Sequence, residues 1–166
     1  MFIVFVRKLV LLVIVLAVMA PLSVLAAEGD VWIEPANGYA GTDQPVALTV
    51  YADTGAQRLG AYQLTVTYDP AAMGVSSQEA DKVVKPGADG FVTAANVDAK
   101  GGRIVVNGVD VYGKGPGIRM ELMKISLKSL KQAGPTEITL DIEALTDEHG
   151  KTIGKPAAAN SVINIR

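Results

Sequence analysis

Apolar and polar residues alternate strictly from Tyr62 to Tyr68, and this stretch is the clearest element of the chain. Successive side chains of a β-strand point to opposite faces, so the apolar residues of the stretch would face one side and the polar residues between them the other. Asp69-Pro70 ends the pattern, because proline has no N–H to donate to a strand ladder and favours a turn. The stretch therefore predicts a half-buried strand in the core of an all-β domain.

Shorter runs with the same two-residue period recur along the chain, at a spacing of roughly 10–15 residues. We predict strands at residues 31–34, 46–51, 62–68, 91–97, 103–109, 118–130, 138–142 and 162–165. Turn-forming residues separate them, with a hairpin expected across 99–102 and a charged turn at 147–150. The segments between the strands show no helical period, and many short strands separated by turns are typical of a β-sandwich or a barrel.

Two local features have a plain structural interpretation. Residues 113–117 combine glycines with a lysine, but a phosphate-binding P-loop needs Gly-Lys-Ser/Thr opening a helix, and here a proline and a strand follow. Trp32 stands alone in its segment, and we expect it to be a core residue at a sheet edge rather than a platform for a ligand.

Residues 1–27 have the organisation of a secretory signal peptide. A basic pair, Arg7-Lys8, precedes an apolar run that ends at Ala20, and small residues follow at 23–27. Cleavage after Ala26 or Ala27 is expected, which leaves residues 28–166 as one domain, secreted to the periplasm or the exterior. Apolar residues also precede the basic pair, so an uncleaved membrane anchor is the alternative.

The net charge limits the kind of partner, and the cysteine content limits how the domain can be stabilised. Without Arg7 and Lys8, 13 of the 15 basic residues remain against 17 acidic ones. This balance argues against nucleic-acid binding, which needs a concentrated basic face. The chain has no cysteine, so the exported domain has no disulfides and must rely on its core, which a chain of this length can bury.

The sequence contains no arrangement typical of a catalytic or metal centre. His149 is the single histidine and lies in the charged turn, without the nucleophile motif that would accompany a Ser-His-Asp triad. One histidine and no cysteine do not make a zinc site. No Asp-x-Asp-x-Asp-Gly loop occurs, although scattered carboxylates leave calcium binding open. We therefore predict a non-catalytic binding module without a cofactor.

The central stretch of the sequence resembles a segment of a known protein family. Residues 60–75 read Gly-Ala-Tyr-Gln-Leu-Thr-Val-Thr-Tyr-Asp-Pro-Ala-Ala-Met-Gly-Val. They resemble the early strand of cohesin domains, which has the pattern Gly-x-aromatic-x-apolar-x-apolar-x-Tyr-Asp-Pro and then x-x-Leu-x-Val. Residues 103–106, 122–128 and 138–150 resemble later strands of the family in the same order, so the likeness covers nearly all of 31–165. The resemblance implies a jelly-roll β-sandwich of about nine strands, shared with the cellulose-binding modules of the same superfamily.

The resemblance also implies a partner. Cohesins bind dockerins, which are small calcium-loaded helical modules, through one flat sheet that includes the Tyr-Asp-Pro strand. In this sequence the outward positions of that strand would be Ala61, Gln63 and Thr65. Family members that bind dockerins often have Asn and Asp at the first two of these positions. This chain has Ala61 and Gln63 there, so the polar contacts to a dockerin would be partly lost. Polar groups buried at an interface confer specificity through what they leave unsatisfied in a wrong partner.

Later strands add candidates to the same presumed face. By alternation, five further residues would point outward: Val105, Asn107, Val109, Leu122 and Lys124. Three of them, Val105, Val109 and Leu122, would form an apolar spot larger than scattered surface residues produce, which indicates a partner. The alternative is that these apolar strands are covered by a loop.

The resulting prediction is a secreted module that attaches a dockerin-like protein partner within an extracellular polysaccharide-degrading or surface assembly. A carbohydrate-binding module for polysaccharide is the alternative, and a purely structural subunit is a third class. Proteins usually bind flat polysaccharide surfaces through a row of exposed aromatic residues. Tyr39, Tyr51 and Tyr112 are scattered along the sequence, and a site would require them to converge in space.

Overall fold

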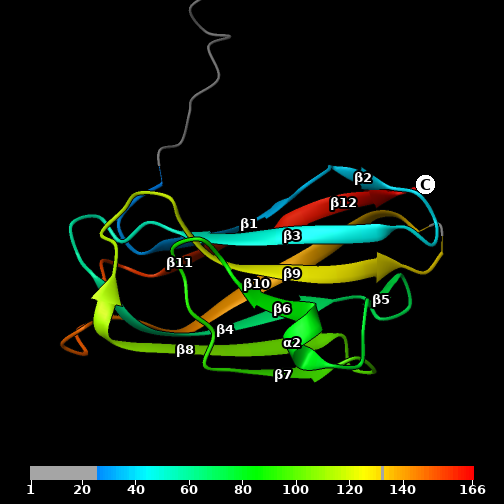
Figure 1. The fold of residues 1–166 in the computed structure, drawn as a ribbon. Helices are drawn as coiled ribbons and strands as arrows, with labels where there is room; N and C mark the ends of the chain where they lie inside the picture. The colour runs from blue at the N-terminus through cyan, green and yellow to red at the C-terminus, as the bar shows by residue number, and fades with distance from the viewer. Residues whose placement is uncertain (1–25, 132) are drawn as a thin grey trace, which may run out of the picture.

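A computed structural model describes residues 26–131 and 133–166 of the chain (Figure 1). The expected signal peptide or anchor lies outside this part except for its last two residues. Within the described ranges, no helix has the length and apolar character needed to cross a bilayer. Two sheets pack face to face, as Figure 1 shows, and the predicted β-sandwich is confirmed.

Each sheet has six strands in the described residues, and most neighbours are antiparallel. The first sheet has the order β11 (Ala157–Ala159), β1 (Asp30–Pro35), β3 (Pro45–Ala52), β9 (Met120–Ser129) and β5 (Met73–Val75), with β6 (Val84–Pro86) also paired to β9. The second sheet has the order β2 (Tyr39–Ala40), β12 (Ser161–Ile165), β10 (Gly134–Asp147), β4 (Leu59–Tyr68), β8 (Arg103–Lys114) and β7 (Ala94–Asp98). Parallel pairs occur where β11 meets β1 and where β2 meets β12.

The core lies between the two sheets and follows the alternation in the sequence. The four apolar residues that alternate along β4 from its fourth position are buried, namely Tyr62, Leu64, Val66 and Tyr68. Residues of the first sheet, such as Ile125 and Leu127 of β9, belong to the same hydrophobic cluster. Full burial of one such side chain is worth about 1.5–3 kcal/mol, so a core of this kind stabilises the domain without disulfides.

The predicted hairpin across 99–102 is confirmed, because β7 pairs with β8 on either side of it. The Asp98 carboxylate accepts the backbone N–H groups of Lys100 and Gly101, at 3.1 and 2.9 Å. Gly102 follows with a φ of 65°, in the left-handed region that glycine adopts without steric cost. The turn fixes the register of β8 and therefore the side on which its residues lie.

The observed strands exceed the nine expected, and four of them, β2, β5, β6 and β11, have only two or three residues. Runs this short are too brief for an alternation to appear in the sequence. A four-residue helix, α2 (Ala80–Val83), was also not predicted. It contacts both β6 and β7, so it closes one edge of the sandwich between the sheets (Figure 1).

Candidate functional site

Six of the eight predicted site residues lie together on the side of the second sheet that faces away from the core, although Thr65 is only 3% exposed there. Ala61, Gln63 and Thr65 of β4 are paired in register with Val109, Asn107 and Val105 of β8. The buried residues Leu64 and Val106 alternate with them and point into the core. We call this exposed side of β10, β4, β8 and β7 the outer face.

A polar network occupies the middle of the outer face. The Glu143 carboxylate accepts a hydrogen bond from the Gln63 amide and one of 2.7 Å from the Thr65 hydroxyl. Arg103 donates to the Thr65 hydroxyl at 3.3 Å, and its guanidinium lies 3.7 Å from the Glu143 carboxylate. The hydroxyl thus donates to one neighbour and accepts from another, which fixes the side chain of Thr65.

Glu143 and Arg103 are functional candidates that the sequence pattern missed. The register of β10 against β4 shifts between Ile142 and Ala144, so Glu143 is the extra residue of a β-bulge. A bulge re-aims side chains locally, and here it turns a carboxylate onto the outer face. Arg103 is the first residue of β8, which sequence reasoning treated only as the start of a strand. No local signal in the sequence connects these residues to Gln63 and Thr65, which lie on another strand.

The network gives the outer face a positioned acceptor. An ionised carboxylate has about four lone-pair sites, and Gln63, Thr65 and Arg103 occupy only part of that capacity. Hydrogen bonds to charged groups are stronger than neutral ones and depend on geometry. The face can therefore bind donor groups of a partner and discriminate against partners that leave the carboxylate unsatisfied.

The other two predicted site residues, Leu122 and Lys124, do not belong to the outer face. Both lie on β9, in the first sheet, and Leu122 is fully buried in the core. The placement of Leu122 on the surface was wrong because β9 has a bulge: Val50 pairs with Met123 but Tyr51 pairs with Glu121. Leu122 is the extra residue, so the alternation changes phase there and both Leu122 and Met123 point inward. Lys124 is exposed, but on the opposite side of the sandwich.

The predicted apolar spot is consequently smaller and differently composed. Val105 is partly buried and Val109 is 58% exposed, whereas Leu122 contributes nothing to the surface. Beyond Val109, β8 continues through two further exposed side chains, Val111 and Tyr112. The exposed apolar surface therefore extends from the outer face along β8, toward the end of the sandwich.

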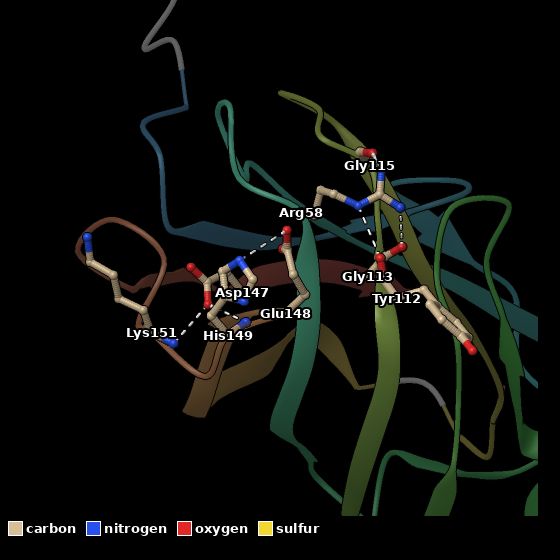
Figure 2. Close-up of polar contacts among 8 residues, drawn as sticks. All are labelled: Arg58, Tyr112, Gly113, Gly115, Asp147, Glu148, His149 and Lys151. Carbon is tan, nitrogen blue, oxygen red and sulfur yellow. Dashed lines mark hydrogen bonds and ion pairs between the residues drawn. The ribbon is translucent and has the colours of Figure 1, made fainter.

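Arg58 holds this end of β8 in place (Figure 2). Its guanidinium donates to the backbone carbonyls of Tyr112, Gly113 and Gly115, at 3.1, 2.6 and 3.2 Å. The register of β8 against β4 jumps here, since Ala61 pairs with Val109 and Leu59 with Lys114. The segment between them is left without ladder partners on β4, and the arginine satisfies its carbonyl groups instead. Residues 113–117 are a strand end and a loop, in line with the plain structural interpretation of their glycines.

The charged turn predicted at 147–150 is present next to this region (Figure 2). The Asp147 carboxylate accepts the backbone N–H groups of Lys151 and His149, at 2.8 and 2.9 Å. The hydrogen bond from Lys151 is the main reason why the pKa of Asp147 is lowered. The imidazole of His149 is exposed to solvent, as expected for a turn histidine.

Trp32 lies on the exposed side of the first sheet, so its assignment to the core was wrong. Val31 and Ile33 are the buried residues of β1, and Trp32 alternates with them. Its ring stacks on that of Tyr51, with centroids 5.7 Å apart, and the Arg119 guanidinium lies 4.1 Å from the Tyr51 centroid. Glu34 accepts the indole N–H of Trp32 at 2.8 Å and two N–H groups of Arg119 at 2.6 and 2.5 Å. Residues separated in sequence thus converge around Trp32.

This cluster predicts a pH-dependent fluorescence signal. The hydrogen bonds that Arg119 donates to Glu34 hold the pKa of the Glu34 carboxyl below its ordinary value. Partial burial raises this pKa, and the hydrogen bond from the Trp32 indole lowers it further. The ion pair therefore stabilises the folded state above the ordinary glutamate pKa and is lost as the pH falls through the lowered one. Trp32 is the only tryptophan, so its emission should change with a midpoint below the ordinary glutamate value. Glu34→Gln should abolish this transition, and its persistence in that variant would assign it to another group.

Among the residues the structure describes, no three His, Cys, Asp or Glu side chains are grouped in a way that could hold a metal ion.

Comparison with known proteins gives a consistent family assignment. A family model described as Cohesin domain matches residues 31–165. Among curated proteins, none is significantly similar to the chain in sequence.

Solved structures agree in fold at low sequence identity. A cohesin module from a family 33 glycoside hydrolase of Clostridium perfringens has a TM-score of 0.66 at 10% identity, over 85% of this chain and 98% of that one. A non-cellulosomal cohesin from Archaeoglobus fulgidus has a TM-score of 0.62 at 18% identity, over 82% and 91%. A type I cohesin–dockerin complex from Clostridium thermocellum contains a chain with a TM-score of 0.61 at 18% identity, over 82% and 99%.

Proposed function

Because the chain belongs to the cohesin family, we propose that it is a binding module that attaches a dockerin-type protein partner through the outer face. Support for this partner comes from the similar cohesin of Clostridium thermocellum, whose structure was solved as a complex with a dockerin. The family is one of binding modules, which agrees with a non-catalytic role.

The observation that carries the proposal is the composition of the outer face. It combines a central polar network around Glu143 with an exposed apolar side chain, Val109, on the neighbouring strand. Interfaces of this kind draw affinity from a few desolvated apolar contacts and specificity from polar groups that must be satisfied. The residues proposed to contact the partner are Ala61, Gln63, Thr65, Val105, Asn107 and Val109, together with Glu143.

The partner is expected to differ in detail from those of cohesins with Asn and Asp at the first two outward positions of this strand. Ala61 offers no hydrogen bond through its side chain, and the amide of Gln63 is already engaged by Glu143. A positioned acceptor on this face is therefore the Glu143 carboxylate, supplied by β10 instead of β4. We propose that the partner presents donors, such as hydroxyl, amide or basic side chains, opposite Glu143.

We further propose that the module acts outside the cytoplasm, after cleavage at residues 26–27. The basic pair, apolar run and small residues of 1–27 support export. The setting would be an assembly that degrades polysaccharides or covers the cell surface, in which one module tethers one partner.

The test is capture of partners from secreted and periplasmic fractions of the organism that makes the protein, with calcium and with a chelator. A partner that carries a dockerin-like segment and dissociates when calcium is removed is the expected result. A partner without such a segment, or one whose binding ignores calcium, would replace the dockerin assignment. Recovery of no protein at all would reject the protein-binding proposal.

A further inference from the structure

The exposed side of the first sheet contains a groove that is separate from the outer face. It is an open groove of about 870 Å³ along β1. Its lining includes Trp32 and Glu34 of β1, Ile118 and Arg119 before β9, and Ala157–Ala159 of β11. The volume lies within the range of about 300–1,000 Å³ typical of sites for small ligands.

Local sequence explains why the groove exists. In the sheet order, β11 lies on one side of β1, while Ile118 and Arg119 approach from the segment leading into β9. Ala159 is paired with Trp32, and its small side chain leaves space beside the indole. On the other side, Tyr51 is paired with Trp32 and supports its ring by stacking. The Trp32 ring is thus supported by Tyr51, lies 6.0 Å from the Arg119 guanidinium and stays partly exposed.

The polar groups of the groove are held in position by hydrogen bonds. Glu34 forms a two-point ion pair with Arg119 and also fixes the indole N–H of Trp32. The carboxylates of Asp30 and Asp53, which also line the groove, accept backbone N–H groups of Ala27 and Gly55. Three carboxylates and one guanidinium do not favour an anionic ligand, and the groups around them offer hydrogen bonds to a neutral one.

We propose that this groove binds a neutral polysaccharide chain, with a sugar ring packed against Trp32 and its hydroxyls bonded near Glu34 and Arg119. A pyranose has an apolar C–H face and a polar hydroxyl edge, and a partly buried indole beside a compensated ion pair matches both. A protein occupant is less favoured. Ile118 is the one exposed large hydrophobic side chain among the described residues of the groove, whereas protein interfaces need a larger apolar centre.

The proposal adds a second function on the opposite side of the sandwich. Because the outer face belongs to the second sheet and the groove to the first, a protein partner and a glycan chain would not compete. The module would then hold its partner at the surface of a polysaccharide.

The single tryptophan provides a direct probe of this groove. Purified protein is titrated with cellohexaose, xylohexaose, mannohexaose and chitohexaose while Trp32 emission is recorded, and retention on insoluble cellulose, xylan, mannan and chitin is measured. A saturable emission change with at least one of these glycans is expected. The absence of both an emission change and retention for all four would overturn the proposal.

Matched variants locate the site. Ala159→Arg fills the space beside Trp32 and should weaken glycan binding by about tenfold or more, which corresponds to about 1.4 kcal/mol. Ala94→Arg places the same change at an exposed alanine on β7 of the second sheet and should leave glycan binding unchanged. Ala159→Arg should also retain capture of the protein partner, which separates this test from that of the proposed function. Glycan binding by Ala159→Arg at the level of the unmodified protein would overturn the proposal.

Discussion

Val109→Arg is expected to weaken binding of the dockerin-type partner by about tenfold to a hundredfold, equivalent to about 1.4–2.7 kcal/mol. Val109 is the most exposed apolar side chain among the six candidates on the outer face, at 58%. It lies directly opposite Ala61 on β4, so a partner that covers this part of the face must bury it. An arginine there would bring a charge into a desolvated contact, and an unpaired buried charge is costly.

The chain provides a closely matched control in Val162. This valine of β12 is 57% exposed and also points away from the core of the second sheet. It pairs with Glu137 of β10, whereas Ala61 pairs with Thr146 of the same strand. At about 3.3 Å per residue the two positions are separated by roughly 25–30 Å along the strand.

Val162→Arg should therefore leave affinity unchanged when both variants are measured by calorimetry or surface plasmon resonance. Equal affinity of Val109→Arg and the unmodified protein would place the partner elsewhere. An equal loss in both variants would indicate a non-specific effect of the added charge.

The part of the outer face formed by β4 and β8 was predictable, because residues 61–68 of β4 and 103–109 of β8 keep a two-residue period. Gln63 and Asn107 lie where the alternation places them, opposite each other in register. Glu143 was not predictable, since the predicted strand ended at Ile142 and the bulge that follows has no signature in the local pattern. The hydrogen bonds of Glu143 join strands that are distant in sequence. Which strands pair, and in which register, does not follow from the two-residue period within each strand.

Trp32 shows a different limit of sequence reasoning. The alternation of Val31, Trp32 and Ile33 already favoured an outward tryptophan, because the two β-branched neighbours share the opposite side. The assignment to the core rested on its isolation from other aromatic residues in sequence. Pairing of β1 with β3 brings Tyr51 beside it, so isolation along the chain was a poor guide to isolation in space.

The bulge in β9 leads to the second large effect. Leu122→Ala should lower the free energy of unfolding by about 2–5 kcal/mol, since it removes a fully buried side chain and leaves a cavity. Lys124→Ala, two residues along the same strand, should change it by less than about 1 kcal/mol, because Lys124 is exposed and its ion pair with Glu121 at 3.2 Å lies at the surface.

Urea unfolding monitored by Trp32 emission distinguishes the two variants through their transition midpoints. Equal midpoints would mean that Leu122 faces solvent and that β9 has no bulge at this point.

The burial of Leu122 also determines how binding data for variants of β9 must be interpreted. A loss of partner binding in a Leu122 variant would report a damaged core, because Leu122 cannot reach the outer face from the first sheet. Lys124→Ala should retain partner binding for the same topological reason, so the pair separates stability from recognition on a single strand.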